Sequence, residues 1–160
     1  EKRSQKTFRQ GEEIVLLVNT GGNGGKGINC NSIWKINEGK IEAVKINEEE
    51  AFDVSLKAPF TVVFKNEALN YVKEFVCKTD SEALFDESGN PENNGEYDGG
   101  FYPPHNIEIS KNSDGKCIVA FTSWSYLSRS SDNDVESVVK YVFDESKQEL
   151  VICDAYVNAD

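Results

Sequence analysis

The sequence contains no methionine, only one histidine and no long run of apolar residues. Its apolar runs are far shorter than the roughly 18 consecutive residues that a membrane-spanning helix requires, so we expect no membrane insertion. Imidazole acid–base chemistry would depend on His105, which follows two prolines at a boundary between loop and strand and is typical of a solvated surface residue. A chain that lacks an initiating methionine is also what removal of a leader segment would produce.

Basic residues are few, with 17 Lys and Arg against 28 Asp and Glu and a net charge of −11. Affinity for nucleic acids and for anionic membrane surfaces depends on Lys and Arg side chains that neutralise phosphates. The composition therefore predicts no nucleic-acid partner, while the acidity is compatible with cations or basic proteins.

Complete motifs for catalysis or cofactor binding are also absent. The glycine-rich segment 18–29, "VNTGGNGGKGIN", fails the P-loop pattern, because Thr20 occupies the first glycine position and Gly27 replaces the Ser or Thr after Lys26. It satisfies the letters of a dinucleotide fingerprint, but "INCNSIWKIN" follows without the helical period that this site needs. We expect a turn between two strands. The serine-rich "TSWSYLS" is not a nucleophile elbow, so we predict no catalytic residue and no cofactor.

The cysteines show no spacing typical of a metal site. Acidic residues gather at 92–98 and 132–136 without the spacing of an EF-hand loop, so calcium is possible but unsupported and no metal ligand is predicted. The four cysteines are even in number and widely spaced, which is typical of disulfides in an exported protein. We therefore expect an extracytoplasmic location (secreted, periplasmic or surface-anchored). In the alternative, Cys117 and Cys153, which lie in apolar runs, are buried thiols. The disulfide candidates are Cys30, Cys77, Cys117 and Cys153.

Alternation of apolar and polar residues with a period of two predicts strands along most of the chain, as in "AFDVSLKA", "PFTVVFK" and "NIEIS". The fold class is therefore all-β, an antiparallel β-sandwich or barrel with at most one or two short helical turns, such as one at 81–87. We expect a polar N-terminal tether over 1–11 and a single β domain over 12–160. Residues 66–78 fit both a helix and a strand, with the strand slightly favoured, and 86–104 are expected to form a long loop.

Aromatic residues at strand ends are the strongest candidates for a binding site. Such residues form stacking platforms or anchors for protein contacts when they are exposed, although Trp124 could instead cap the core. The sequence thus predicts an exported or surface-displayed, non-catalytic domain that binds a protein or a glycan. The alternatives are a small carboxylate-dependent hydrolase and a β-barrel carrier of an apolar small molecule. The predicted ligand-binding residues are Tyr97, Phe101, Tyr102, Trp124 and Tyr126.

Overall fold

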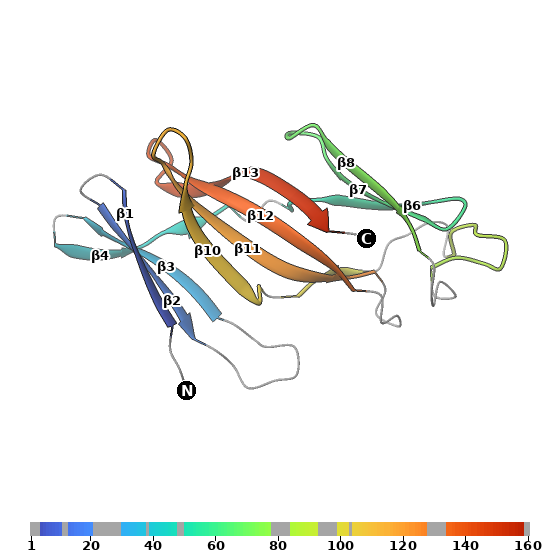
Figure 1. The fold of residues 1–160 in the computed structure, drawn as a ribbon, viewed down its shortest axis with the longest axis horizontal. Helices are drawn as coiled ribbons and strands as arrows, with labels where there is room; N and C mark the ends of the chain where they lie inside the picture. Colours follow the sequence, from blue (N-terminus) through green and yellow to red (C-terminus); the bar gives the residue numbers. More distant parts are fainter. Residues whose placement is uncertain are drawn as a thin grey trace. The chain divides into compact units, whose positions relative to one another are not determined.

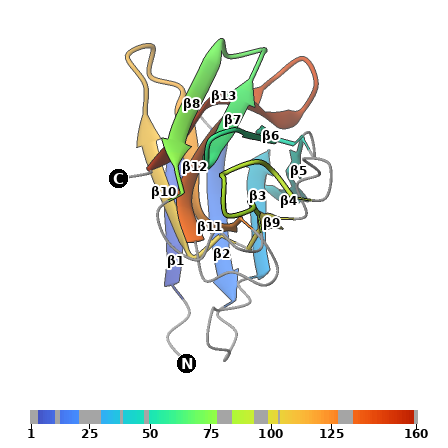
Figure 2. The same cartoon turned by 90° about the vertical axis from the view of Figure 1, so that its right-hand side faces the viewer.

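The structure is a computed structural model that describes residues 4–10, 13–20, 30–37, 39–47, 50–77, 84–92, 99–102, 104–127 and 134–158. Within these residues every regular element is a β-strand, as Figures 1 and 2 show, and the predicted antiparallel all-β fold of the sandwich or barrel class is confirmed. The strands are β1 (Ser4–Gln10), β2 (Glu13–Thr20), β3 (Cys30–Asn37), β4 (Lys40–Ala43), β5 (Lys45–Ile46), β6 (Asp53–Lys57), β7 (Thr61–Asn66), β8 (Tyr71–Val76), β9 (Gly100–Phe101), β10 (Asn106–Lys111), β11 (Cys117–Tyr126), β12 (Asp134–Asp144) and β13 (Glu149–Asn158).

The strands form three sheets. Their orders are β1-β2-β3-β4, β6-β7-β8, and β10-β11-β12-β13-β5 with β9 also paired to β11. Neighbours in the first two sheets are antiparallel, whereas β5 pairs with β13 in parallel, with Lys45 opposite Glu149. In the third sheet β11, β12 and β13 each have a paired strand on both sides.

Close contacts group the chain into two compact units, and the divisions between them fall within β11, β12 and β13. Neither unit is therefore a continuous stretch of chain, and the single domain over 12–160 stays a prediction. The first unit comprises 1–49, 103–121 and 140–153, and the second comprises 50–102, 122–139 and 154–160.

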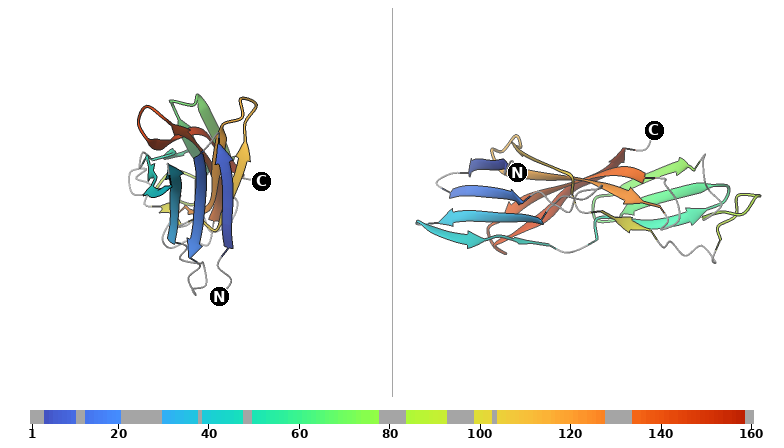
Figure 3. Two further views of the ribbon diagram at one scale, coloured as in Figure 1. Left: turned by 90° about the vertical axis from the view of Figure 1, so that its left-hand side faces the viewer. Right: turned by 90° about the horizontal axis from the view of Figure 1, so that it is seen from below.

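The first unit contains the sheet β1-β2-β3-β4, which Figure 3 shows from two further sides. The rings of Phe121 and Tyr141 pack at 5.3 Å between centroids in a T-shaped arrangement, which aromatic pairs favour. Among the side chains of this unit that the structure describes, the buried apolar ones are Ile33, Ile107, Cys117, Val119, Phe121, Tyr141, Phe143 and Leu150.

The second unit contains the meander β6-β7-β8, whose alternation follows the sequence prediction. Val62 and Phe64 have no exposed surface, while Asp53 and Lys57 on β6 point to the exposed face. The ring of Phe64 contacts those of Phe52 (5.7 Å) and Phe75 (5.9 Å). The other buried apolar side chains described in this unit are those of Cys77, Leu84, Phe85, Leu127, Val135, Val138, Ala155 and Val157.

Two segments that the sequence left open or predicted differently are strands. In 66–78, residues 67–70 form a turn and Tyr71–Val76 form β8, so the favoured strand is confirmed. Ser4–Gln10, which the sequence predicts as part of a tether, form β1 in register with β2. Because strand pairing uses backbone groups, an edge strand such as β1 needs no apolar alternation.

Other predicted segments are described only in part. The glycine-rich residues 21–29 lie outside the description, but β2 and β3 on either side pair antiparallel, with Thr20 opposite Cys30. A strand therefore follows the glycines where a dinucleotide site requires a helix. Of the helical turn expected at 81–87, the described residues 84–87 contain a turn and an isolated bridge from Phe85 to Pro91 instead.

The disulfide prediction is wrong for Cys77, Cys117 and Cys153, which are thiols. Cys117 lies on β11 and Cys153 on β13, with β12 between these strands. Adjacent strands lie about 4.8 Å apart, so residues two strands apart exceed the ~7 Å between Cα atoms that a disulfide can bridge. Cys117 is the buried thiol of the alternative reading, whereas Cys153 is exposed. The side chain of Cys30 lies outside the described residues.

Candidate functional site

The short strand β9 brings two of the predicted aromatic segments together. Phe101 lies opposite Ser125 and Gly100 lies opposite Tyr126 in the antiparallel pair β9–β11. The pairing continues at Tyr102, whose N–H donates to the carbonyl oxygen of Trp124 at 2.8 Å. Four of the five predicted residues therefore lie on two adjacent segments, while the fifth, Tyr97, lies outside the described residues.

The register separates Phe101 from the other aromatic residues. Residues opposite each other in a strand pair share one face of the sheet, so Phe101 lies on the same face as the fully buried Ser125. Its ring contacts Phe52 (6.0 Å, stacked) and Phe64 (6.5 Å). Phe101 is 41% exposed, but it extends the aromatic core of the second unit.

The remaining three residues form one cluster, which we call the aromatic patch: Tyr102, Trp124 and Tyr126. Successive side chains alternate between the two faces of a strand, so Trp124 and Tyr126 lie on the same face. The ring of Tyr126 packs against Tyr102 at 4.9 Å between centroids, with the ring planes tilted by 55°. Trp124 is 38% exposed, so its ring is accessible to a partner and does not merely cap the core.

Gly100 is the residue that allows Tyr126 to take this position. A Cβ atom at Gly100 would lie 2.5 Å from the Tyr126 hydroxyl oxygen and 2.8 Å from its Cζ, both closer than real Cβ contacts. The absence of a side chain therefore lets the phenol ring lie directly on the backbone of β9. The sequence offered one signal for this contact, the glycine pair that precedes Phe101.

Polar groups border the patch on β12. Ser137 Oγ donates to the carbonyl oxygen of Ser123 at 3.3 Å, and β12 runs beside β11. This bond places Ser137 beside Ser123. Glu136, which precedes Ser137, therefore lies on β12 beside Trp124, which follows Ser123 on β11. The carboxylate of Glu136 accepts a hydrogen bond from Asn158 Nδ2 at 2.9 Å. An exposed indole on β11, with a carboxylate on the adjacent strand β12 and an amide on β13 beyond it, can combine ring stacking with hydrogen bonding.

Lys35, in the first unit, is a buried charged residue that the sequence analysis did not single out. Its side chain is 8% exposed, and its ammonium lies 3.6 Å from Glu42 Oε2, donates to Gln148 Oε1 and lies 5.3 Å from the ring centroid of Phe143. Glu42 is its cross-strand partner in β3–β4. The charge is thus balanced by an acid, an amide and an aromatic face, which fits a structural role. A lysine in the apolar run "SIWKI" was the available signal.

The carboxyl groups with altered pKa values show shifts in one direction within the described residues. The pKa is lowered at Glu67 by the hydrogen bond from Lys65, at Asp86 by hydrogen bonds from Asn90, and at Asp144 by hydrogen bonds from Ser146. A catalytic general acid needs the opposite shift. The hydrolase alternative therefore gains no support from these groups.

The other candidate residues also give no support to catalysis or metal binding. Burial raises the pKa of the Cys117 thiol to about 11, which keeps it protonated and unreactive near neutral pH. His105 is exposed. Among the described side chains, no group of three or more His, Cys, Asp or Glu is placed to hold a metal ion. The calcium candidates at 92–98 and 132–136 lie mostly outside the description.

None of the described residues belongs to a helix long and apolar enough to cross a membrane. Comparisons of the chain with protein-family models, curated proteins and solved structures find no match. Function must therefore be inferred from the residues of the site itself.

Proposed function

We propose that the chain is a non-catalytic binding domain that contacts a protein or a glycan through the aromatic patch. The observation that carries the proposal is the gathering of Tyr102, Trp124 and Tyr126 on β11 and the segment paired with it, with the Trp124 ring exposed. The loops next to these residues would add further contacts.

Physical properties of the patch support recognition by contact. Trp and Tyr rings present large, rigid faces that lose little conformational entropy on binding, and each also carries a polar N–H or O–H group. The net charge of −11 opposes phosphate-rich partners and favours neutral glycans or neutral and basic protein surfaces. The Glu136–Asn158 pair supplies hydrogen-bonding groups beside the rings.

The test is a binding screen of the whole chain against a glycan array and a library of protein fragments, followed by Trp124→Ala. Truncating a central aromatic anchor removes about 2 kcal/mol or more of binding free energy. We therefore expect binding of the retained ligand to weaken at least tenfold, measured by calorimetry. The control is Ile41→Ala, which truncates an apolar residue on β4 of the first unit that is more exposed than Trp124 (63% against 38%) and should leave affinity unchanged. A screen that retains nothing, or full affinity in Trp124→Ala with native circular dichroism, would contradict the proposal.

The proposed binding function does not depend on the compartment. The predicted extracytoplasmic location relied on disulfides, and the thiols at Cys77, Cys117 and Cys153 remove that support. An exported or surface-displayed protein stays a prediction, which thiol counting in the denatured, unreduced protein tests. Four reactive thiols would count against it.

A further inference from the structure

Strand β8 forms one edge of the three-stranded sheet in the second unit, as the order β6-β7-β8 and Figure 1 show. The N–H of Cys77, the residue after β8, donates to the carbonyl oxygen of Phe60 at 2.7 Å on the side of β7. Backbone groups of successive residues alternate between the two sides of a strand. Counting back from Cys77, the residues whose N–H and C=O groups point away from β7, toward an edge with which no described strand pairs, are Val72, Glu74 and Val76.

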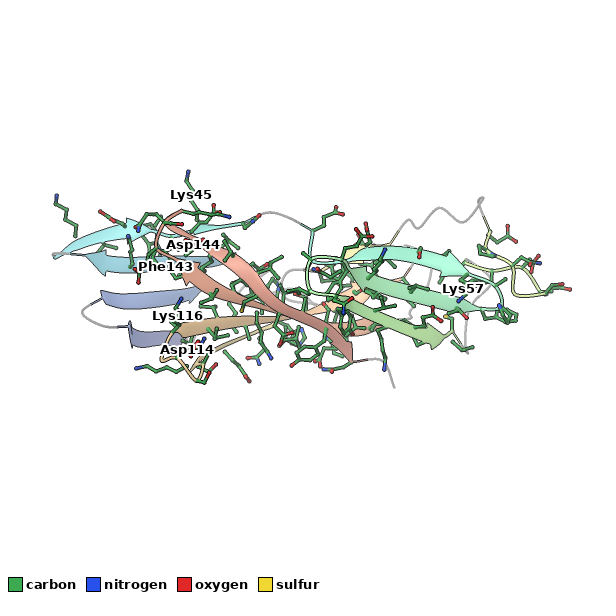
Figure 4. All side chains as sticks on the ribbon, turned by 90° about the horizontal axis from the view of Figure 1, so that it is seen from above. Lys45, Lys57, Asp114, Lys116, Phe143 and Asp144 are labelled. Atoms are coloured by element: carbon green, nitrogen blue, oxygen red, sulfur yellow. The ribbon has the colours of Figure 1, made fainter. Side chains whose placement is uncertain are left out.

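The same three residues carry the exposed side chains of β8. Val72 is 58% exposed and Val76 is 56% exposed, and the carboxylate of Glu74 lies between them on this face. Glu74 is 3.3 Å from the ammonium of Lys57 on β6, which Figure 4 labels, but both side chains are about half exposed. Such a surface pair contributes little, so a closer cation can recruit Glu74. Natural edge strands usually hide or charge such apolar positions.

A second copy of the chain fits this edge poorly. Two copies of β8 can pair antiparallel about a two-fold axis. Side chains directly opposite each other then point to the same face of the sheet only when one residue lies opposite its own copy. In the two such registers that pair the most residues of β8, the residue opposite its own copy is Lys73 or Glu74. Like charges directly opposite each other destabilise a strand pair. The occupant must instead bring a charge opposite to that of Glu74.

We propose that β8 binds an extended peptide segment of a partner protein, which adds to the sheet as a further strand. The segment carries a basic residue opposite Glu74 and apolar residues two positions before and after it, opposite Val72 and Val76. Main-chain hydrogen bonds supply the attachment, and the alternate side chains supply the specificity. Because one basic residue between two apolar residues is a symmetrical pattern, the segment can carry it in either strand direction. This edge and the aromatic patch have no residue in common, so the inference does not depend on the function proposed above.

The probe is a capped synthetic peptide with valine, lysine and valine at alternate positions and threonine elsewhere, titrated into the whole chain with fluorescence anisotropy. We expect saturable binding to the native protein and at least tenfold weaker binding to Glu74→Lys. A charge-swapped peptide, with glutamate in place of lysine, should regain binding to Glu74→Lys, which a misfolded variant could not do. The control Ile41→Lys, at an exposed apolar position on the edge strand β4, should bind the first peptide normally.

Three results would overturn the proposal. The first is no saturable binding of the lysine peptide to the native chain. The second is equal binding by a peptide in which the amides that face β8 are N-methylated, because such a peptide cannot donate hydrogen bonds to the strand. The third is a concentration-dependent dimer in sedimentation that Val72→Thr abolishes, because the occupant would then be a second copy.

Discussion

At the scale of single residues, the position of the Tyr126 ring depends on an absent side chain. Its hydroxyl oxygen lies where a Cβ atom of residue 100 would be, and its ring packs on Tyr102. Gly100 therefore sets the geometry of the aromatic patch without contributing an aromatic group. A methyl group added there must push the phenol away from β9.

We expect Gly100→Ala to lower the free energy of unfolding by about 1–3 kcal/mol, the usual cost of overpacking. The same substitution should cost less in a Tyr126→Phe background, because the closest atom, the hydroxyl oxygen, is then missing. Denaturant unfolding of the wild type, both single variants and the double variant measures this coupling. Strictly additive effects would show that the ring does not lie on Gly100.

The patch also shows which parts of a site sequence can predict. The positions of Trp124 and Tyr126 at the end of an apolar run marked them as surface candidates, and Trp124 is indeed exposed. The sequence could not show that Phe101 belongs to the opposite face. That face is fixed by the register with Ser125, which is a pairing between residues distant in sequence. Gly100 and Lys35 were missed for the same reason, because their roles depend on contacts with other strands.

At the scale of elements, a single carboxylate organises the turn between β12 and β13. Asp144, labelled in Figure 4, accepts hydrogen bonds from Ser146 N (2.9 Å), Ser146 Oγ (2.6 Å) and Lys147 N (3.3 Å). These bonds favour the ionised carboxylate and lower its pKa below the ordinary value of 3.8. In the unfolded chain the bonds are lost and the pKa returns to that value.

A group whose pKa is lower in the folded state adds stability at pH values above its unfolded pKa, and this stability is lost as the pH falls through the folded pKa. We therefore expect Asp144→Ala to be less stable than the wild type at neutral pH and to approach it as the pH falls below 3.8. Urea unfolding at a series of pH values tests this. Asp114→Ala is the control, because in the turn before β11 the accepting side chain is that of Asn112. A pH-independent difference for Asp144→Ala would contradict the assignment.

Strands were predictable where side chains alternate between a core and a free face. In β6 and β7 the alternation is strict, and the residues expected inward are buried or half-buried. In β8 the half-buried positions of Tyr71 and Phe75 are four residues apart, a spacing that also fits a helix, so periodicity could not decide. The residues of β1, "SQKTFRQ", show no alternation of apolar and polar residues, and pairing through backbone groups needs none, so the sequence holds no pattern to detect.

At the scale of the whole molecule, the division into two compact units passes through three strands. Each of β11, β12 and β13 thus contributes residues to both units. When one of these strands loses its pairing in one unit, the part of the same strand in the other unit is no longer continued by an ordered segment. The two units should therefore unfold together although the contacts within each are dense.

The two tryptophans report on this directly, because Trp34 belongs to the first unit and Trp124 to the second. We expect Trp34→Phe and Trp124→Phe each to show a single fluorescence transition in denaturant. In each variant, the midpoint of this fluorescence transition should coincide with the midpoint at which the circular dichroism signal of the strands is lost. Separate midpoints for fluorescence and circular dichroism would show two independently folding domains and would contradict the single domain predicted over 12–160.

Cys153 lies exposed on β13, where its thiol donates to the carbonyl oxygen of Lys140 at 3.4 Å. Because this thiol is exposed, oxidation by air can join two molecules through a disulfide between their Cys153 residues. The joined pair would present two aromatic patches to an immobilised ligand, and such bivalency can raise apparent affinity by about 10²–10⁴-fold without any new contact. Avidity of this kind disappears when the thiol is kept reduced or replaced in Cys153→Ser.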